Sequence, residues 1–484
     1  MKFRSTRGAE ESISAAKAII NGLSKDGGLY VPDKFPEIYD SLKKDTVISY
    51  EDLAFEVIKE YFTDIPEEDL KGAIHDAYNG RFSVSVKNNF LELYHGPTCA
   101  FKDAALLFLP QIMRRAKRLL NVKEEITILT ATSGDTGKAA LEGFSNVDGF
   151  KVAVYYPKHG VSPIQERQMV SQKGSNVEVI GIEGNFDDAQ TGVKKIFGDT
   201  DFKDSLAKKG YILSSANSIN IGRLVPQIVY YFYGYFALVN QGKVKLDEKI
   251  NVVVPTGNFG NILAGFYAKK MGLPIDKLIC ASNENKVLTD FFSSGTYDKR
   301  RELVLTESPS MDILVSSNLE RLLYEASSRD AVKTKEFMDK LFEEGSYKIT
   351  DEMEEFIKDF YGDYAIEDEV HESIKEIFND KNYLIDTHTA VAYSVWKKYV
   401  KNTGDDKEAL ILSTASPFKF PRSICNSLDI SVDKLNDFDV LEKLSKDTKN
   451  EIPKNLAGLK NAEVLHKTVC EKNEMKKALL EFLK

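Results

Sequence analysis

A single lysine, Lys102, stands in the stretch LYHGPTCAFKDAA (93–105), between Phe101 and Asp103 and ahead of small and apolar residues. A charged ammonium group is costly to keep in apolar surroundings, and burial lowers the pKa of a lysine. The neutral amine that results is a nucleophile for aldehydes. The stretch therefore predicts covalent chemistry between Lys102 and a carbonyl compound.

A glycine-rich turn in VVVPTGNFGNILAG (252–265) predicts a phosphate site. It joins a valine-rich strand to a helix and consists of Gly257, Asn258, Phe259, Gly260 and Asn261. Free backbone N–H groups at the start of a helix bind anions, and glycine permits close approach. The turn does not follow the dinucleotide pattern G-x-G-x-x-G. An ordinary strand–helix turn is the alternative, and the motif alone does not exclude it.

A second strand–helix turn adds hydroxyl groups to the same geometry. TATSGDTGKAA (130–140) carries Ser133, Asp135 and Thr136. Its backbone predicts another anion site, but serine, threonine and aspartate are also good helix caps. A plain N-cap is therefore the alternative for this turn.

Two further stretches place polar groups beside apolar elements. SSANSINIGRLVPQ (214–227) contains Asn217, Ser218 and Arg223, and arginine suits bidentate recognition of phosphate. Taken alone, this stretch favours a polar loop with a surface arginine. In LSTASPFKF (412–420), Thr414 follows an apolar strand, where open α/β sheets bind ligands. A strand-end cap explains that position equally well.

One cofactor would use these groups together. Pyridoxal phosphate has an aldehyde for Lys102, a phosphate for the turn at 257–261 and a ring nitrogen within reach of a hydroxyl such as Thr414. Phe101 could pack near the ring. No feature calls for a metal, and we interpret His95 and His388 as structural.

The elements that position these groups alternate between strands and helices from about residue 125 onward, which predicts parallel sheets with right-handed crossovers. We expect a helical N-terminal extension over 1–90 and a small α/β domain over 126–209. A large domain would comprise 91–125 and 210–484, with a helical insertion at about 300–382. The aromatic-rich stretch 228–239 is too short to span a bilayer and predicts a buried helix whose first turn holds the proline before it.

The bulk properties fit a cytosolic enzyme. The 484 residues suggest two or three domains, and the net charge of −9 argues against a general nucleic-acid or anionic-membrane binder. The four cysteines lie far apart without metal spacing, and the N-terminus lacks an apolar signal core. We expect reduced thiols, a cytoplasmic location and a monomer, with a dimer left open.

Taken in order, the motifs resemble those of the threonine synthases. HGPTCAFKDAA resembles the family's Schiff-base segment, and TATSGDTGKAA, NSINIGR, PTGNFGN and STASPFKF are similar to its other motifs. RSTRG near the start resembles the opening of the longer bacterial and fungal branch. The resemblance runs from about residue 4 to residue 420, and the tail beyond 425 carries none of these motifs.

The resemblance implies fold type II of the pyridoxal-phosphate enzymes, the tryptophan synthase β type, with the cofactor between two α/β domains. It also implies conversion of O-phospho-L-homoserine and water to L-threonine and phosphate. Lys102 would form the Schiff base, the turn at 257–261 would hold the cofactor phosphate, and Thr414 would contact the pyridine nitrogen. Ser133 and Thr136 would hold the substrate's carboxylate. The substrate's phosphate would be held by Asn217, Ser218 and Arg223.

Asp135 departs from the pattern of related type II enzymes, which have an asparagine near the cofactor's phenolic oxygen. A carboxylate facing a phenolate would require a shared proton. Two other functions stay open: a phospho-lyase that releases 2-oxobutyrate, and a catalytically silent protein that binds the cofactor. The intact Lys102 argues against the silent protein, and the full motif set favours the synthase.

Overall fold

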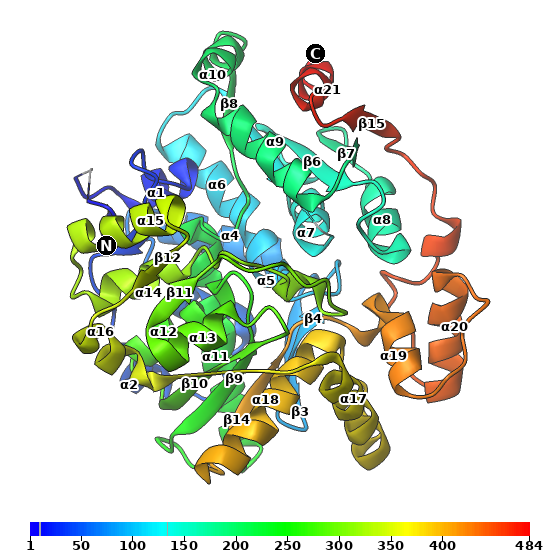
Figure 1. Ribbon diagram of the computed structural model, residues 1–484. Coiled ribbons are helices and arrows are strands. Elements are labelled where there is room, and N and C mark those ends of the chain that lie inside the picture. The colour runs from blue at the N-terminus through cyan, green and yellow to red at the C-terminus, as the bar shows by residue number, and fades with distance from the viewer. Residues whose placement is uncertain (9–10, 133) are drawn as a thin grey trace.

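The structure is a computed structural model that describes residues 1–8, 11–132 and 134–484. Its larger sheet has six strands, all parallel except for one antiparallel edge strand (Figure 1). In neighbour order these strands are β13 (Phe360–Tyr364), β10 (Ile275–Ser282), β9 (Ile250–Pro255), β14 (Ala409–Ser413), β4 (Phe90–His95) and β3 (Ser83–Lys87). Every residue of β9 is buried, as expected for an apolar central strand covered on both faces.

Three adjacent strands of this sheet end at the predicted functional segments. Lys102 follows β4, the turn at 257–261 follows β9, and Thr414 directly follows β14. The sheet order places β14 between β9 and β4, and all three run parallel. Because parallel strands end at the same edge of a sheet, segments more than 300 residues apart in the chain converge there.

The smaller sheet is entirely parallel and lies above the larger one in Figure 1. In neighbour order its strands are β15 (Thr468–Glu471), β7 (Val177–Glu183), β6 (Phe150–Pro157), β5 (Glu125–Ala131) and β8 (Tyr211–Ser214). The helices attached to it are α7 (Asp135–Phe144), α8 (Pro163–Val170), α9 (Phe186–Gly198), α10 (Thr200–Ala207) and α21 (Met475–Phe482).

The expected small domain does not include all strands of the smaller sheet. The expectation of 126–209 stops before β8, which pairs with β5, and it leaves out the tail strand β15, which pairs with β7. Figure 1 shows the orange-to-red tail passing from the large domain to the small one. Short strands of this kind give no periodic signal in the sequence, because only their distant partners define them.

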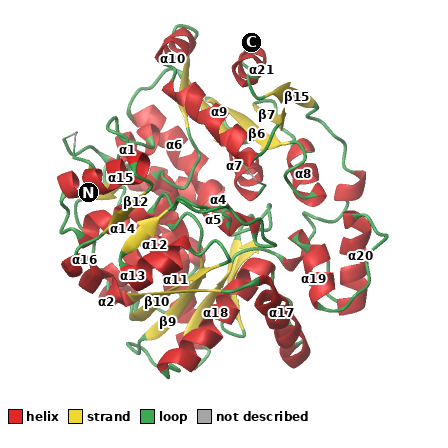
Figure 2. Cartoon of the chain, in the orientation of Figure 1, coloured by secondary structure: helices red, strands yellow, loops and turns green. Residues whose placement is uncertain are grey.

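The helical layers around the large sheet are shown in red in Figure 2. The N-terminal segment contributes α1 (Ala15–Asn21), α2 (Tyr39–Leu42), α3 (Tyr50–Ile58) and α4 (Glu67–Tyr78), and also strands β1 (Phe3–Ser5) and β2 (Tyr30–Pro32). After β4 come α5 (Asp103–Leu106) and α6 (Phe108–Leu119). Later helices are α12 (Gly260–Lys270), α13 (Val287–Ser294), α14 (Leu319–Ala326), α15 (Ala331–Glu343), α16 (Asp351–Phe356), α17 (Glu367–Lys381), α18 (Thr387–Thr403), α19 (Pro421–Ser427) and α20 (Asp437–Thr448).

Two expectations about this layer change. The segment 300–382 is not a purely helical insertion, because it contains β13, which extends the large sheet, and β12 (Ser346–Lys348), which pairs with β11 (Thr296–Asp298). The aromatic stretch lies in the buried helix α11 (Ile221–Asn240), but Pro226 falls inside that helix rather than in its first turn. Among the described residues, no helix is long and apolar enough to cross a membrane.

Candidate active site

Lys102 lies at the start of the short helix α5, immediately after the β4 loop. Its side chain is 11% exposed, and Nζ lies 3.5 Å from Asp135 Oδ2 and 3.3 Å from Ser310 Oγ. Burial lowers the pKa of Lys102, while the carboxylate of Asp135 opposes this shift. The structure thus supports the expectation of a lysine that is readily deprotonated.

Asp103 fixes the loop that delivers Lys102. Its carboxylate accepts hydrogen bonds from the backbone N–H and the hydroxyl of Thr98, at 2.9 and 2.7 Å. Burial raises the pKa of Asp103 to about 6. Gly96 is required here because a Cβ at this position would lie 2.3 Å from Asp103 Oδ2.

Thr414 is joined directly to the Lys102 segment. The backbone N–H of Phe101 donates to Thr414 O at 2.8 Å, and Ala100 and Ala415 form an isolated β-bridge. Thr414 is 5% exposed, and the ring of Phe101 lies 5.5 Å from Lys102 Nζ. The two segments therefore form one wall of the site.

The turn at 257–261 forms the start of α12. Phe259 adopts φ +63 at the start of α12, and its buried ring packs against Phe292 and Phe360. Asn261 Oδ1 accepts hydrogen bonds from the Tyr230 and Tyr231 hydroxyls at 2.6 and 2.8 Å, which turns this side chain toward α11. Asn261 Nδ2 is buried and has no hydrogen-bond partner among the described residues. It and the backbone N–H groups at the helix start are the donors left for an anion.

Arg223 is buried, so the alternative of a surface arginine is wrong. The residue is 3% exposed, and its Nη1 donates to Ala216 O at 2.7 Å. Its Nε is buried and has no hydrogen-bond partner within the part of the chain that the structure describes. Burial lowers the pKa of Arg223 to about 10, and its charge in turn lowers the pKa of Lys102. A buried cation with an unused donor near Lys102 fits an anionic ligand.

The other predicted substrate residues are less clearly brought together. Asn217 is exposed, and Ser218 Oγ accepts a hydrogen bond from Asn318 Nδ2 at 3.1 Å. Thr136 lies half-buried in the first turn of α7. Ser133 lies outside the described residues. The roles of all four stay predictions.

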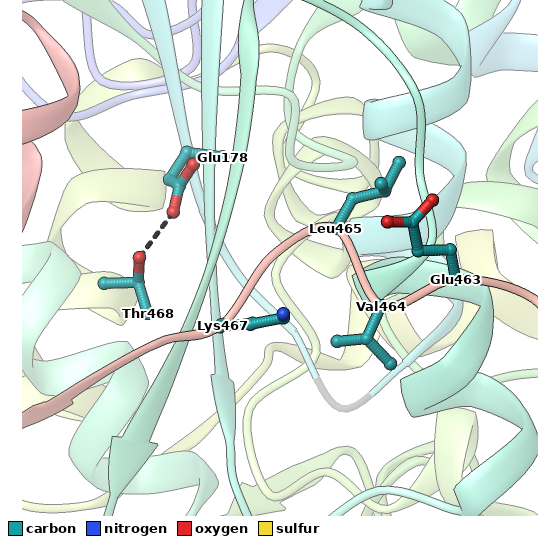
Figure 3. Close-up of a pocket in the computed structure, with 6 residues that line it drawn as sticks. All are labelled: Glu178, Glu463, Val464, Leu465, Lys467 and Thr468. Atoms are coloured by element: carbon teal, nitrogen blue, oxygen red, sulfur yellow. Dashed lines mark hydrogen bonds between the residues drawn. The ribbon is translucent and has the colours of Figure 1, made fainter.

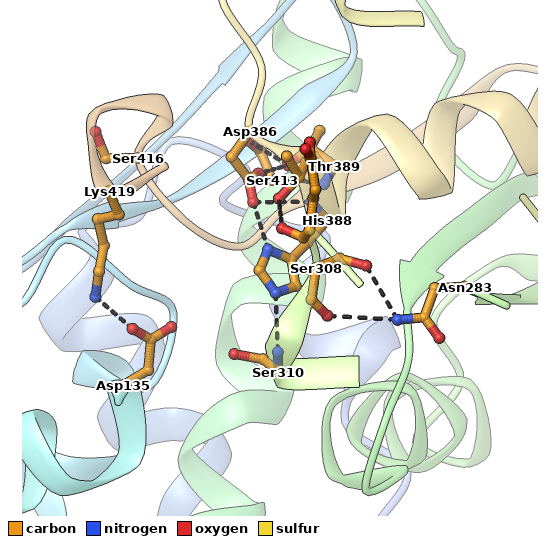
Figure 4. Close-up of polar contacts among 12 residues, drawn as sticks. Asp135, Asn283, Ser308, Ser310, Asp386, His388, Thr389, Ser413, Ser416 and Lys419 are labelled. Carbon is orange, nitrogen blue, oxygen red and sulfur yellow. Dashed lines mark hydrogen bonds and ion pairs between the residues drawn. The ribbon is translucent and has the colours of Figure 1, made fainter. Parts of the chain in front are cut away.

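Asp135 has a cationic partner that the sequence analysis missed. Lys419 is fully buried, and its Nζ donates to Asp135 Oδ1 at 2.5 Å and to Thr98 O at 3.0 Å (Figure 4). Burial alone would raise the pKa of Asp135, but Lys419 and then Lys102 lower it to a strongly acidic value. The carboxylate is therefore ionised between two lysines, and no shared proton is needed to hold it there.

Lys419→Met is expected to destabilise the cofactor-free protein by about 3–5 kcal/mol, because it removes one partner of a buried ion pair. The double variant Lys419→Met, Asp135→Asn should recover much of that loss, since a neutral amide needs no counter-ion. Calorimetric melting of both variants and of Asp135→Asn alone measures the coupling energy between Lys419 and Asp135. A single variant as stable as the wild type, or a double variant no better than the single one, would contradict the assignment.

A buried histidine–aspartate pair, His388 and Asp386, makes further polar contacts in Figure 4. His388 Nδ1 lies 2.8 Å from Asp386 Oδ2, and His388 Nε2 accepts a hydrogen bond from the Ser310 backbone N–H at 3.2 Å. We interpret His388 as structural from the sequence, and no motif includes Ser310 or Asp386. No local signal marks them, because the contact joins residues 78 positions apart.

Comparison with known protein families settles the relationship of the chain. Residues 2–78 match the family described as "Threonine synthase N terminus", residues 90–347 match "Pyridoxal-phosphate dependent enzyme", and residues 389–479 match "Threonine synthase, C-terminal". The chain is also 37% identical to threonine synthase of Saccharomyces cerevisiae over 464 residues, which cover 88% of this chain and 89% of the yeast protein. The chain belongs to the threonine synthase family.

Solved structures of that family have the same fold throughout. The structure of threonine synthase from yeast has a TM-score of 0.88 at 35% identity and covers 100% of this chain and 98% of its own. A pyridoxal-phosphate-bound threonine synthase from Brucella melitensis has a TM-score of 0.87 at 35% identity, covering 100% and 99%. The fold is therefore type II of the pyridoxal-phosphate enzymes. The C-terminal match corrects the expectation that the tail beyond 425 lies outside the family resemblance.

The threonine synthase-like relatives are longer than this chain. Threonine synthase-like 1 of Homo sapiens is 40% identical over 448 residues, which are 87% of this chain. The match spans 59% of the human protein, so the chain corresponds to little more than half of that relative's length.

Two other features lie outside the predicted site. A cavity of about 590 Å³ lies where the tail crosses β7 (Figure 3), lined by Glu178, Glu463, Val464, Leu465, Lys467 and Thr468. None of these residues belongs to a predicted motif, so we assign the cavity no role. Among the described residues, Glu307, Glu367 and His371 also form a group of the kind that could hold a metal ion. His371 Nε2 lies 3.2 Å from Glu307 Oε2, and Glu367 Oε1 accepts a hydrogen bond from the Glu307 backbone N–H at 3.0 Å. These contacts account for the proximity of the three residues.

Proposed function

We propose that the protein is a threonine synthase that converts O-phospho-L-homoserine and water to L-threonine and phosphate with pyridoxal phosphate. The observation that carries this proposal is a nearly buried amine, Lys102, near a buried guanidinium, Arg223, whose Nε has no partner in the described chain. The Lys102 amine can bond to an aldehyde, and the Arg223 guanidinium can bind the phosphate of a substrate. Family membership supplies the reaction in which both are used.

The residues present fit the cofactor. Lys102 would bond to its aldehyde carbon, the backbone N–H groups of 257–261 would hold its phosphate, and Thr414 would meet its ring nitrogen. When bound, pyridoxal phosphate delocalises the electron pair left by proton removal from an amino acid. The hydroxyl of Thr414 offers a neutral hydrogen bond at that nitrogen, so it does not enforce ring protonation as a carboxylate would.

The chain's own groups would carry the proton and phosphate steps. The Lys102 amine would take a proton from the substrate's Cα and then one from Cβ, which lets the γ-phosphate depart. Protons return at Cγ and at Cα, and water adds at Cβ. Arg223 binds the γ-phosphate and stabilises the charge that grows on it as the C–O bond breaks. Asp135, ionised beside Lys419, supplies an acceptor for the Lys102 ammonium. Closure of the small domain would exclude bulk water.

Incubation with O-phospho-L-homoserine and identification of the products tests this proposal. L-threonine and phosphate are expected. Phosphate with 2-oxobutyrate and ammonia would instead support a phospho-lyase, and no product at all would support a silent cofactor-binding protein.

We further propose that the protein is a cytoplasmic monomer. The cytoplasmic location agrees with the four free, buried cysteines.

Thr414→Ala is expected to weaken cofactor binding by about two- to tenfold and to change the absorbance spectrum of the bound cofactor, because one neutral hydrogen bond is lost. The fold should survive. Ser413→Ala is the matched control, since the Ser413 hydroxyl faces Thr389 Oγ1 at 3.1 Å. Titration of the cofactor-free proteins with pyridoxal phosphate measures the difference. Identical binding and spectra in the Thr414 variant and the wild type would refute the contact.

A further inference from the structure

Ser310 touches the reactive lysine from a segment that no motif predicts. Its Oγ lies 3.3 Å from Lys102 Nζ. Ser310 belongs to a single 3-10 turn, Pro309–Met311, in the long connection between β11 and α14. The contact joins residues 208 positions apart, so the fold must bring this turn to Lys102 by other means.

The 3-10 turn Pro309–Met311 lies between the predicted phosphate-binding turn at 257–261 and α18. A Cβ on Gly257 would lie 2.7 Å from Ser310 O, so the glycine lets the two backbones approach. On the other side, the Ser310 N–H donates to His388 Nε2 at 3.2 Å. Farther along the same connection, Ser316 Oγ donates to Gly257 O at 2.7 Å. Ser310 is therefore held from both sides in one position.

The hydrogen bonds assign a role to each ring nitrogen of His388. The Asp386 carboxylate accepts from the backbone N–H groups of His388 and Thr389 at 3.0 and 3.2 Å. His388 Nδ1, 2.8 Å from Asp386 Oδ2, must then be the donor. The other nitrogen, Nε2, accepts from Ser310 N–H and so carries no proton. His388 is 3% exposed and thus acts as a fixed acceptor for the Ser310 N–H.

This arrangement matters for Lys102 once the amine has taken a proton. An ammonium has three N–H donors and no acceptor. Asp135 Oδ2 at 3.5 Å and Ser310 Oγ at 3.3 Å can accept two of them. The third N–H is then left to face a bound substrate. Two fixed acceptors would set the direction in which Lys102 delivers its proton.

We propose that Ser310 is a further catalytic residue, whose hydroxyl orients the Lys102 amine for proton transfer, and that Asp386 and His388 are positioning residues that hold Ser310 in place. The proposal rests on the proposed function only in taking Lys102 as the base. It does not depend on which amino acid is the substrate.

Ser310→Ala is expected to lower kcat by about 10²-fold, as misorientation of a catalytic group does, with KM and the melting temperature nearly unchanged. Ser310→Thr keeps the hydroxyl and should restore much of kcat. A fall in kcat that threonine does not rescue, or one that follows a loss of folded protein, would assign Ser310 a structural role and overturn the proposal.

A second measurement uses cofactor-free protein. The rate of pyridoxal phosphate uptake should rise with pH as the Lys102 amine loses its proton. Stopped-flow absorbance measures this rate at each pH and gives the midpoint of the rise. Burial has the largest effect on the pKa of Lys102; Asp135 raises that pKa, and Lys419 and Arg223 lower it. Loss of an acceptor destabilises the ammonium, so Ser310→Ala should move the midpoint to lower pH. An unmoved midpoint would overturn the proposal, whereas failure of the proposed function would appear as wild-type protein that does not turn over O-phospho-L-homoserine.

His388 variants test the positioning role. His388→Leu removes the acceptor for Ser310 N–H and should reproduce the kcat loss and midpoint shift of Ser310→Ala. His388→Gln can still offer an oxygen to that N–H and should retain more activity. Equal effects of the two variants, or a normal midpoint in His388→Leu, would show that His388 does not act through Ser310.

Discussion

Lys102→Ala is expected to lose turnover by about 10²–10⁴-fold or more and to lose the covalent link to the cofactor. The physical reason is that Lys102 is both the proposed bonding amine and the proposed base. Borohydride reduction of the wild-type holoenzyme, followed by peptide mass spectrometry, should place the cofactor on Lys102. The spectrum of Lys102→Ala with added cofactor should lack the reducible species.

A second buried lysine, Lys419, is the alternative site of attachment that this experiment distinguishes from Lys102. Lys419 also lies beside Asp135, but it is held by an ion pair and by the carbonyl of Thr98. Burial lowers the pKa of Lys102, so we expect Lys102 to be the amine that reacts. Lys138→Ala, which removes a nearby lysine paired with Glu142, is the matched control and should keep the link. Attachment of the cofactor to Lys419 or any other lysine would contradict the assignment.

Arg223→Ala is expected to lower kcat/KM for O-phospho-L-homoserine by about tenfold to several hundredfold, with cofactor affinity little changed. Each charge-assisted hydrogen bond to phosphate contributes about 1.5–3 kcal/mol, and a guanidinium can make two. The structure strengthens this expectation, because Arg223 is buried with an unused Nε rather than solvated.

Arg223→Lys should recover only part of the loss, since an ammonium lacks the planar pair of donors. Arg223→Lys keeps a cation at this position, so its melting temperature in the cofactor-free protein should stay close to that of the wild type, which separates this role from a structural one. Near-normal kcat/KM in both variants would remove Arg223 from the site.

Local sequence predicted the parts of the site that depend on one strand end or one turn. The Lys102 segment, the turn at 257–261 and Thr414 each follow an apolar strand, and the parallel topology explains why they meet. The alternation of strands and helices likewise predicted parallel strand pairing. These signals are contained within a short stretch of chain.

The parts that sequence could not predict are contacts between distant segments. Lys419 pairs with Asp135 across 284 positions, and nothing near Lys419 distinguishes it from a surface lysine. Ser310 lies in a connection with little regular structure. The strand β15 is defined only by its pairing with β7. In each case the physical cause is burial against a partner that the linear pattern does not identify.

The most direct test of the proposed function is turnover of O-phospho-L-homoserine in water enriched in ¹⁸O. If Lys102 and Arg223 act as proposed, phosphate leaves by cleavage of its bond to Cγ, and water then adds at Cβ. The label should appear in the hydroxyl of L-threonine and be absent from the released phosphate. Label in the phosphate, with homoserine as the other product, would show attack of water at phosphorus and contradict the account.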